Sequence, residues 1–172
     1  MKEKTIAFIG AGNMAGALIR GLLQDGHPAE RIIAVDPDRQ KLDVFSSESG
    51  INCTTDNAAA VSAADIVVLA VKPQIVASVA QELASAVQKQ QPLVISVAAG
   101  IRIEHLEHWL GPDCAIVRTM PNTPAMLQAG ATGLFASVRV SEEQRSLAES
   151  LMRAVGITIW VEHEGLIDAV TA

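Results

Sequence analysis

Short apolar runs alternate with longer segments of helical periodicity along nearly the whole chain. The run at 65–71 (DIVVLAV) is a clear example of a buried strand, and it is followed by a long helical pattern that Pro73 can begin. The predicted strands are 4–9, 31–35, 51–53, 65–71, 93–98, 115–120, 130–138 and 157–162. The predicted helices cover about 13–25, 38–48, 57–62, 73–88, 103–110 and 142–155. This alternation predicts an α/β fold with a doubly wound, mainly parallel sheet and helices on both faces.

The length of 172 residues fits one domain, which we expect to span 1–163. The last nine residues, EGLIDAVTA (164–172), have the pattern of a helix that begins and does not reach a C-cap. We interpret them as the start of a connecting helix. Their apolar residues Leu166, Ile167, Ala169 and Val170 are expected to be mobile or covered by another copy of the chain.

Composition narrows the function class. Hydrophobic residues make up 49% of the chain and aromatic residues only 3%, which favours a core of Ala, Val, Ile and Leu. The net charge of −6 argues against a nucleic acid or an anionic membrane as the partner. No apolar run reaches the roughly 18 residues that a membrane helix needs. Two widely separated cysteines, Cys53 and Cys114, are interpreted as reduced core residues of a cytoplasmic protein.

The first predicted strand runs into a glycine turn, G10-A-G12-N-M-A15, which matches G-x-G-x-x-A. Gly10 lets the chain turn sharply, Gly12 lets a pyrophosphate approach the backbone, and Ala15 lets the helix lie close to the sheet. The free N–H groups of the helix start favour an anion at this place. The turn therefore predicts a Rossmann-type dinucleotide site, with a plain packing corner as the alternative.

Asp36 ends the second predicted strand, 26 residues past Gly10, where such sites place an acid for the ribose hydroxyls. Alone, a carboxylate there favours NAD over NADP, whereas the nearby Arg39 and Lys41 favour the opposite. Asp36 and Asp38 have a second interpretation, in which they only begin the next helix, because Asp is a good N-cap. Both interpretations stay open.

Three further strand ends meet at the same predicted edge: VKP (71–73), SVAAG (96–100) and RTMPNTP (118–124). The small Ala98 and Ala99 leave room for a flat ring. Lys72 can reach a phosphate or carboxylate, and Asn122 can donate to a carboxamide. Each residue also has an ordinary structural explanation by itself.

The sequence gives little sign of metal binding or of nucleophilic catalysis. Of the four histidines, only His105 and His108 have a metal-like spacing, at i and i+3 of a predicted surface helix, and no further ligand accompanies them, so no metal is predicted. Neither cysteine has an activating neighbour in the sequence, and no serine lies in a nucleophile elbow.

The motifs IGAGNM, AVKPQ, SVAAGI and MPNTPAMLQAGAT together resemble pyrroline-5-carboxylate reductase, and the resemblance extends over essentially the whole chain. It implies an N-terminal NAD(P)H-binding domain followed by a helical domain that forms the homo-oligomer and most of the substrate site. The implied cofactor contacts are Ile9, Gly10, Ala11, Gly12, Asn13, Met14, Asp36, Asn57, Val71, Lys72, Pro73, Ala98, Ala99 and Asn122. Of these, Asn122 would lie near both the nicotinamide and the substrate.

The implied reaction is hydride transfer from the nicotinamide to the C=N carbon of 1-pyrroline-5-carboxylate, giving L-proline. Many family members prefer NADPH, but Asp36 stands where they often carry a small polar residue, so NADH stays open. The family's helical domain lies outside this chain. We therefore expect no catalytic residue within 1–172, and we expect this chain alone to bind nucleotide without turnover.

Two alternatives remain. One is another NAD(P)-dependent imine or 3-hydroxyacid oxidoreductase on the same scaffold. The other is a non-catalytic module that senses NAD(P).

Overall fold

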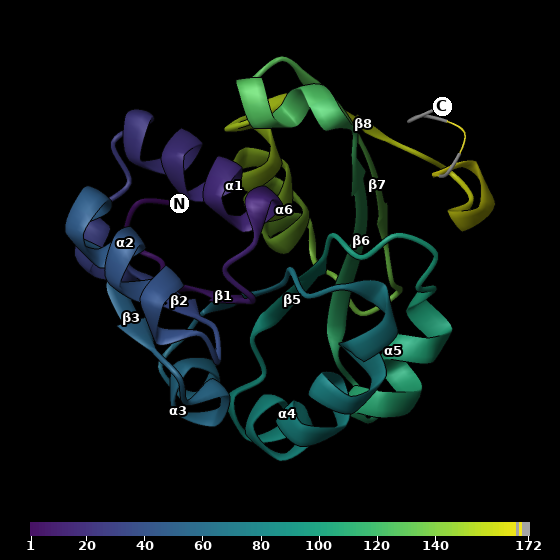
Figure 1. The fold of residues 1–172 in the computed structure, drawn as a ribbon. Helices are drawn as coiled ribbons and strands as arrows, with labels where there is room; N and C mark the ends of the chain where they lie inside the picture. Colours follow the sequence, from purple (N-terminus) through teal and green to yellow (C-terminus); the bar gives the residue numbers. More distant parts are fainter. Residues whose placement is uncertain (168, 170–172) are drawn as a thin grey trace.

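The computed structural model describes residues 1–167 and 169, and its centre is one eight-stranded sheet with the strand order β3-β2-β1-β4-β5-β6-β7-β8 (Figure 1). The strands are β1 Ile6–Ile9, β2 Ile32–Val35, β3 Asn52–Thr54, β4 Ile66–Leu69, β5 Leu93–Ser96, β6 Ala115–Pro121, β7 Gly130–Ala136 and β8 Gly156–Trp160. The α-helices are α1 Asn13–Gln24, α2 Arg39–Ser49, α3 Asn57–Ser62, α4 Val76–Gln90, α5 Ile103–Leu110 and α6 Glu142–Arg153. Short 3-10 helices are η1 Ala29–Arg31, η2 Pro73–Ile75, η3 Thr123–Leu127 and η4 Glu164–Leu166.

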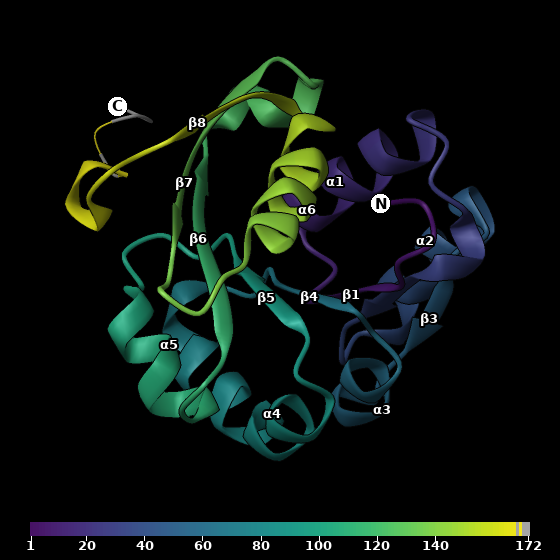
Figure 2. The same ribbon diagram turned by 180° about the vertical axis from the view of Figure 1, so that it is seen from behind.

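Helices cover both faces of the sheet, as predicted. Strand residues alternate between the faces, so Ile6 and Phe8 of β1 enter one hydrophobic core while Ala7 and Ile9 enter the other. The first core is closed by α1, α2 and α6, and the second by α3, α4 and α5. Figures 1 and 2 show these two groups of helices on opposite sides of the strands. The Rossmann-like α/β class predicted from the sequence is confirmed.

One pair of strands departs from the parallel arrangement. β6 and β7 pair antiparallel, whereas β7 and β8 pair parallel. The reason is the connection: only residues 122–129, containing η3, join β6 to β7, which is too short for a crossover. By contrast, α6 carries the chain from β7 to β8. The sequence pattern predicted a strand at 130–138 without its direction.

Two helix starts can be explained by their own residues. The Ser141 hydroxyl accepts the Gln144 N–H, and the Gln144 side chain accepts the Ser141 N–H, which is a capping box at the start of α6. The helix predicted from Pro73 begins as the 3-10 turn η2 and continues as α4. None of the helices in the described residues has the length and apolar character needed to cross a bilayer.

The segment after β8 differs from its prediction. Ile167 is fully buried within its own chain, so the expectation that it would be mobile or covered by another copy is wrong. Leu166 is 48% exposed and Ala169 is exposed. Val170 lies outside the described residues. The chain forms the short turn η4 here.

Candidate functional site

The carboxyl ends of β1, β2 and β4 border a cavity of about 500 Å³. Parallel strands bring their carboxyl ends to one edge of a sheet, and ligands of open α/β sheets bind outside that edge. The cavity lining includes seven of the implied cofactor contacts: Ile9, Gly10, Gly12, Asp36, Asn57, Val71 and Lys72.

Gly10 makes the turn out of β1. Its φ is +101°, and a Cβ at this position would lie 2.8 Å from the Ala70 carbonyl oxygen. Its N–H donates to the Val35 carbonyl at 2.8 Å, while the Ala70 N–H donates to the Ile9 carbonyl at 2.9 Å. The backbone of the turn is therefore pinned between β2 and the end of β4, and only glycine fits there without strain.

Gly12 has the opposite surroundings. It is the N-cap of α1 without any side-chain cap, and an ideal Cβ on it meets no atom of the described residues within 4 Å. The first intrahelical bond runs from the Gly16 N–H to the Gly12 carbonyl, so the N–H groups of Asn13, Met14 and Ala15 precede it. Open space over unbonded helix-start amides is the geometry that fits a diphosphate.

Asp36 is 8% exposed, and its carboxylate accepts backbone N–H groups both from the glycine turn and from the segment after β2. Its Oδ2 accepts the Ala11 N–H at 3.1 Å, and its Oδ1 accepts the Asp38 N–H at 3.0 Å. Lys41 Nζ lies 3.7 Å from Oδ1. Asp38 is the residue that caps α2, through the Gln40 N–H at 3.0 Å. The helix-start interpretation thus applies to Asp38, whereas Asp36 fastens the glycine turn to β2.

The far wall of the cavity comes from α3, η2 and α4. The Asn57 amide donates to Glu82 Oε1 at 3.2 Å, which joins α3 to α4. Ile75, 47% exposed, adds an apolar surface beside Lys72. Sequence reasoning missed Ile75 and Glu82. An apolar residue one helical turn past Val71-Lys72 was the available signal for Ile75.

A second cavity of about 350 Å³ adjoins the other side of the glycine turn. Ala11, Gly12 and Asn13 line it together with Arg20 of α1 and Met126 of η3. The turn therefore has open space on two sides. Met126 shows that the segment after β6 reaches the glycine turn, although it is distant in the sequence.

The remaining predicted residues lie at the same edge but outside the first cavity. Ala98 is buried and Ala99 is exposed in the loop after β5, and Pro73 begins η2. Met14 is partly buried and packs against the hydrophobic core that α1, α2 and α6 cover. Asn122 follows β6, and its Oδ1 accepts the Ala131 N–H at 2.9 Å, so its NH₂ group is the part left to donate.

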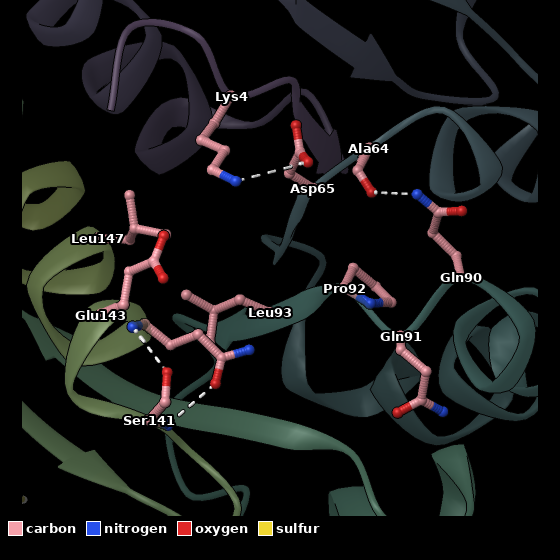
Figure 3. Close-up of a pocket in the computed structure, with 11 residues that line it drawn as sticks. Lys4, Ala64, Asp65, Gln90, Gln91, Pro92, Leu93, Ser141, Glu143 and Leu147 are labelled. Atoms are coloured by element: carbon pink, nitrogen blue, oxygen red, sulfur yellow. Dashed lines mark hydrogen bonds and ion pairs between the residues drawn. The ribbon is translucent and has the colours of Figure 1, made fainter.

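The opposite edge of the sheet also has a cavity, of about 320 Å³, near the amino ends of β1, β4 and β5 (Figure 3). Its polar groups mostly bond to the protein itself. Lys4 Nζ lies 3.9 Å from Asp65 Oδ1, and the Gln90 amide donates to the Ala64 carbonyl at 3.1 Å. Ser141 and Gln144, also in its wall, form the capping box of α6. Lys4, Asp65, Gln90, Ser141 and Gln144 thus have partners within the protein.

Titratable side chains do not assemble into a further reactive centre within the described residues. Burial raises the pKa of the Cys53 and Cys114 thiols, which disfavours the thiolate needed for nucleophilic chemistry. Both cysteines are free. No group of three or more metal-ligating side chains occurs in the part of the chain that the structure describes.

Comparison with known proteins identifies the family of this chain. A family model described as NADP oxidoreductase, coenzyme F420-dependent, matches residues 5–100, which is more than half of the chain. The chain belongs to this family. The matched range begins at β1 and ends in the loop after β5, so it contains the glycine turn and the whole wall of the 500 Å³ cavity.

Individual relatives are more specific. The chain is 49% identical to the pyrroline-5-carboxylate reductase of Pseudomonas aeruginosa over 172 residues, which are 100% of this chain and 63% of the relative. A pyrroline-5-carboxylate reductase structure from Coxiella burnetii has a TM-score of 0.94 at 45% identity, covering 96% of this chain and 61% of that one. The Plasmodium falciparum pyrroline carboxylate reductase with NADP bound has a TM-score of 0.83 at 25% identity, covering 94% and 59%. This chain therefore spans less than two thirds of the length of these relatives.

Proposed function

We propose that this chain is the NAD(P)H-binding part of a pyrroline-5-carboxylate reductase, an enzyme that reduces 1-pyrroline-5-carboxylate to L-proline. The observation that carries the proposal is the open space over the first turn of α1, at the edge of the sheet where Rossmann folds bind dinucleotides. Similarity to reductases of this name along the whole chain supports the substrate, and favours it over the other oxidoreductases and the sensing module considered above.

The positions of the cavities support an assignment of residues to each part of the cofactor. The N–H groups at the start of α1 hold the diphosphate, with Gly10, Ala11 and Gly12 shaping the turn. Val71 and Ile75 offer apolar surface to the adenine, and Lys72, exposed beside them, offers a positive charge.

At the other end of the site, we place the nicotinamide against Ala98 and Ala99. The NH₂ group of Asn122 is then a donor toward the carboxamide or the substrate. When bound, NAD(P)H supplies the hydride for the C=N carbon, and the ring nitrogen takes up one proton. We assign no proton donor to a residue of this chain.

We further propose that Asp36 does not exclude NADPH. Its two oxygens already accept backbone N–H groups, and the Lys41 ammonium lies beside it. Lys41 lines the cavity with 54% of its side chain exposed, so it is available to a ribose 2′-phosphate. NADPH and NADH are both accommodated by this arrangement.

In this proposal, residues 1–163 form the cofactor domain, and 164–172 begin the connection to a helical domain that completes the substrate site and the homo-oligomer. The relatives' greater length supports it. Residues 1–172 alone then bind NADPH without turnover. The two free thiols support a cytoplasmic location.

The test is an assay of the full-length protein and of residues 1–172, with 1-pyrroline-5-carboxylate and either coenzyme. We expect NAD(P)H oxidation and proline formation by the full-length protein only. Absence of turnover by the full-length protein with both coenzymes would overturn the proposed reaction. Turnover by residues 1–172 would overturn the proposed division between domains.

A further inference from the structure

One carboxylate, that of Glu164, joins three segments that are far apart in the sequence. Its Oε1 accepts the backbone N–H of Ile103 at 2.8 Å and also lies 3.3 Å from Arg118 Nη1. Glu164 begins η4, after β8, whereas Ile103 begins α5 and Arg118 lies within β6. In both Figure 1 and Figure 2 the yellow segment after β8 is on the same side of the molecule as α5.

The start of α5 depends on this contact. The residue at the N-cap position of α5 is Arg102, which supplies no side-chain cap. A helix start has unbonded N–H groups and a positive dipole end, and a carboxylate satisfies both. Glu164 therefore acts as the cap of α5 from a position 61 residues along the chain.

Arg118 keeps the Glu164 carboxylate in place. Arg118 is 2% exposed, and a guanidinium offers several N–H donors in a fixed planar arrangement. The Glu164 side chain is 23% exposed. An ion pair this well shielded from water is screened much less than the pairs on the surface.

The loop between β5 and α5 is thereby held at both ends. At its beginning, the Val97 N–H donates to the Leu69 carbonyl at 3.2 Å, and the Ala98 N–H donates to Ser96 Oγ at 3.3 Å. At its end, Glu164 fixes the Ile103 N–H. Ala99 lies exposed between these two anchors, in the part of the loop that the proposed function places against the nicotinamide.

We propose that Glu164 is a positioning residue for the loop 97–102, and that Arg118 holds its carboxylate toward the loop. This inference rests on the proposed function, because it assumes that Ala98 and Ala99 contact the nicotinamide half of the cofactor. The inference predicts an effect on only one half of the bound cofactor. The adenosine half lies in the cavity bordered by β1, β2 and β4, which Glu164 does not touch. Loss of the Glu164 carboxylate weakens the nicotinamide end of the site alone.

The experiment measures binding of two probes by calorimetry: NADPH, and adenosine 2′,5′-bisphosphate, which lacks the nicotinamide half. The variants are Glu164→Ala and Glu164→Gln, and the matched control is Glu162→Gln, which changes an exposed acid two residues away. We expect Glu164→Ala to weaken NADPH about tenfold, because a charge-assisted hydrogen bond is lost, and to leave the bisphosphate affinity within about twofold. Glu164→Gln keeps an acceptor for the Ile103 N–H and should lose less, whereas Glu162→Gln should match the wild type.

Equal weakening of both probes by Glu164→Ala would show a general loss of structure and overturn the inference. So would unchanged NADPH affinity in both Glu164 variants. If Glu164→Ala does not fold, the NADPH-to-bisphosphate ratio of Glu164→Gln decides, and a ratio equal to that of the wild type overturns the inference. A wild-type protein that binds neither probe overturns the proposed function, and this inference with it.

Discussion

Both edges of the sheet carry cavities, and the two edges differ in what the polar groups around these cavities bond. At the amino edge, Lys4 pairs with Asp65, Gln90 bonds a backbone carbonyl, and Ser141 with Gln144 caps α6. At the carboxyl edge, the first N–H groups of α1 face open space over Gly12. A cavity alone therefore does not indicate a binding site. Polar groups without a partner in the protein do indicate a binding site, because exchanging bound water for a ligand costs them little free energy.

The largest effect is expected for Gly10→Ala at the carboxyl edge. A side chain there forces the φ of +101° on alanine and brings Cβ within 2.8 Å of the Ala70 oxygen. Strain and overpacking together should lower the free energy of unfolding by about 3 kcal/mol, measured by urea denaturation. An unfolding midpoint equal to that of the wild type would mean that the turn is not pinned between β2 and β4.

The next largest effect is expected for Asp36→Ser. The buried Ala11 N–H loses its acceptor, so the free energy of unfolding should fall by about 1–3 kcal/mol. Because Asp36 fastens the glycine turn, the affinities for NADH and NADPH should fall together in parallel titrations. A variant that gains NADPH affinity while it loses NADH affinity would show instead that Asp36 contacts the ribose hydroxyls.

At the amino side of the molecule, His27 should make stability depend on pH without affecting the cofactor. Burial lowers the pKa of His27 below its usual 6.5, against an opposing interaction with the Lys4 backbone. The nearby amino terminus, Arg31 and Lys2 also lower this pKa. The unfolded state therefore takes up a proton that the folded state does not, once the pH falls below about 6.5.

Stability should accordingly decrease on acidification from pH 7.5 to 5.5, by at most about 1.4 kcal/mol per pH unit for this one group. Urea denaturation at both pH values should show a smaller decrease in His27→Gln. The same decrease in the variant and the wild type would assign the pH dependence to other groups.

Lys4→Ala should have the smallest effect. The Lys4–Asp65 pair is 3.9 Å long with side chains 37% and 44% exposed, so solvent screens it. We expect less than about 1 kcal/mol of lost stability and an unchanged NADPH affinity. Weakened NADPH binding in this variant would contradict the division between the two edges.

The sequence was sufficient for much of the fold, because buried strands and amphipathic helices leave a local periodic signal. The helices 57–62 and 103–110 were placed at their observed bounds. The direction of β7 was not predictable from its own residues, since it depends on the short connection after β6. Ile167 was misjudged because its burial comes from tertiary packing that no local pattern encodes.

The same distinction applies to the site. Gly10 and Gly12 could be recognised because a β-turn-α unit at the start of the chain has a fixed local spacing. The spacing of Asp36 could not separate binding a ribose from fastening the turn. The contacts of Glu164 with Ile103 and Arg118 join residues 61 and 46 positions apart, and no spacing rule predicts them.

The most direct test of the account is calorimetric titration of NADPH into wild type and Gly12→Ala, with thermal unfolding of both proteins measured in parallel. The new methyl group meets no atom within 4 Å in the part of the chain that the structure describes, so the unfolding temperature should stay close to that of the wild type. The methyl group does occupy the space over the helix-start amides, so NADPH affinity should fall by at least about tenfold. Gly12→Ala that binds NADPH as tightly as the wild type would contradict the claim that a diphosphate lies against this turn.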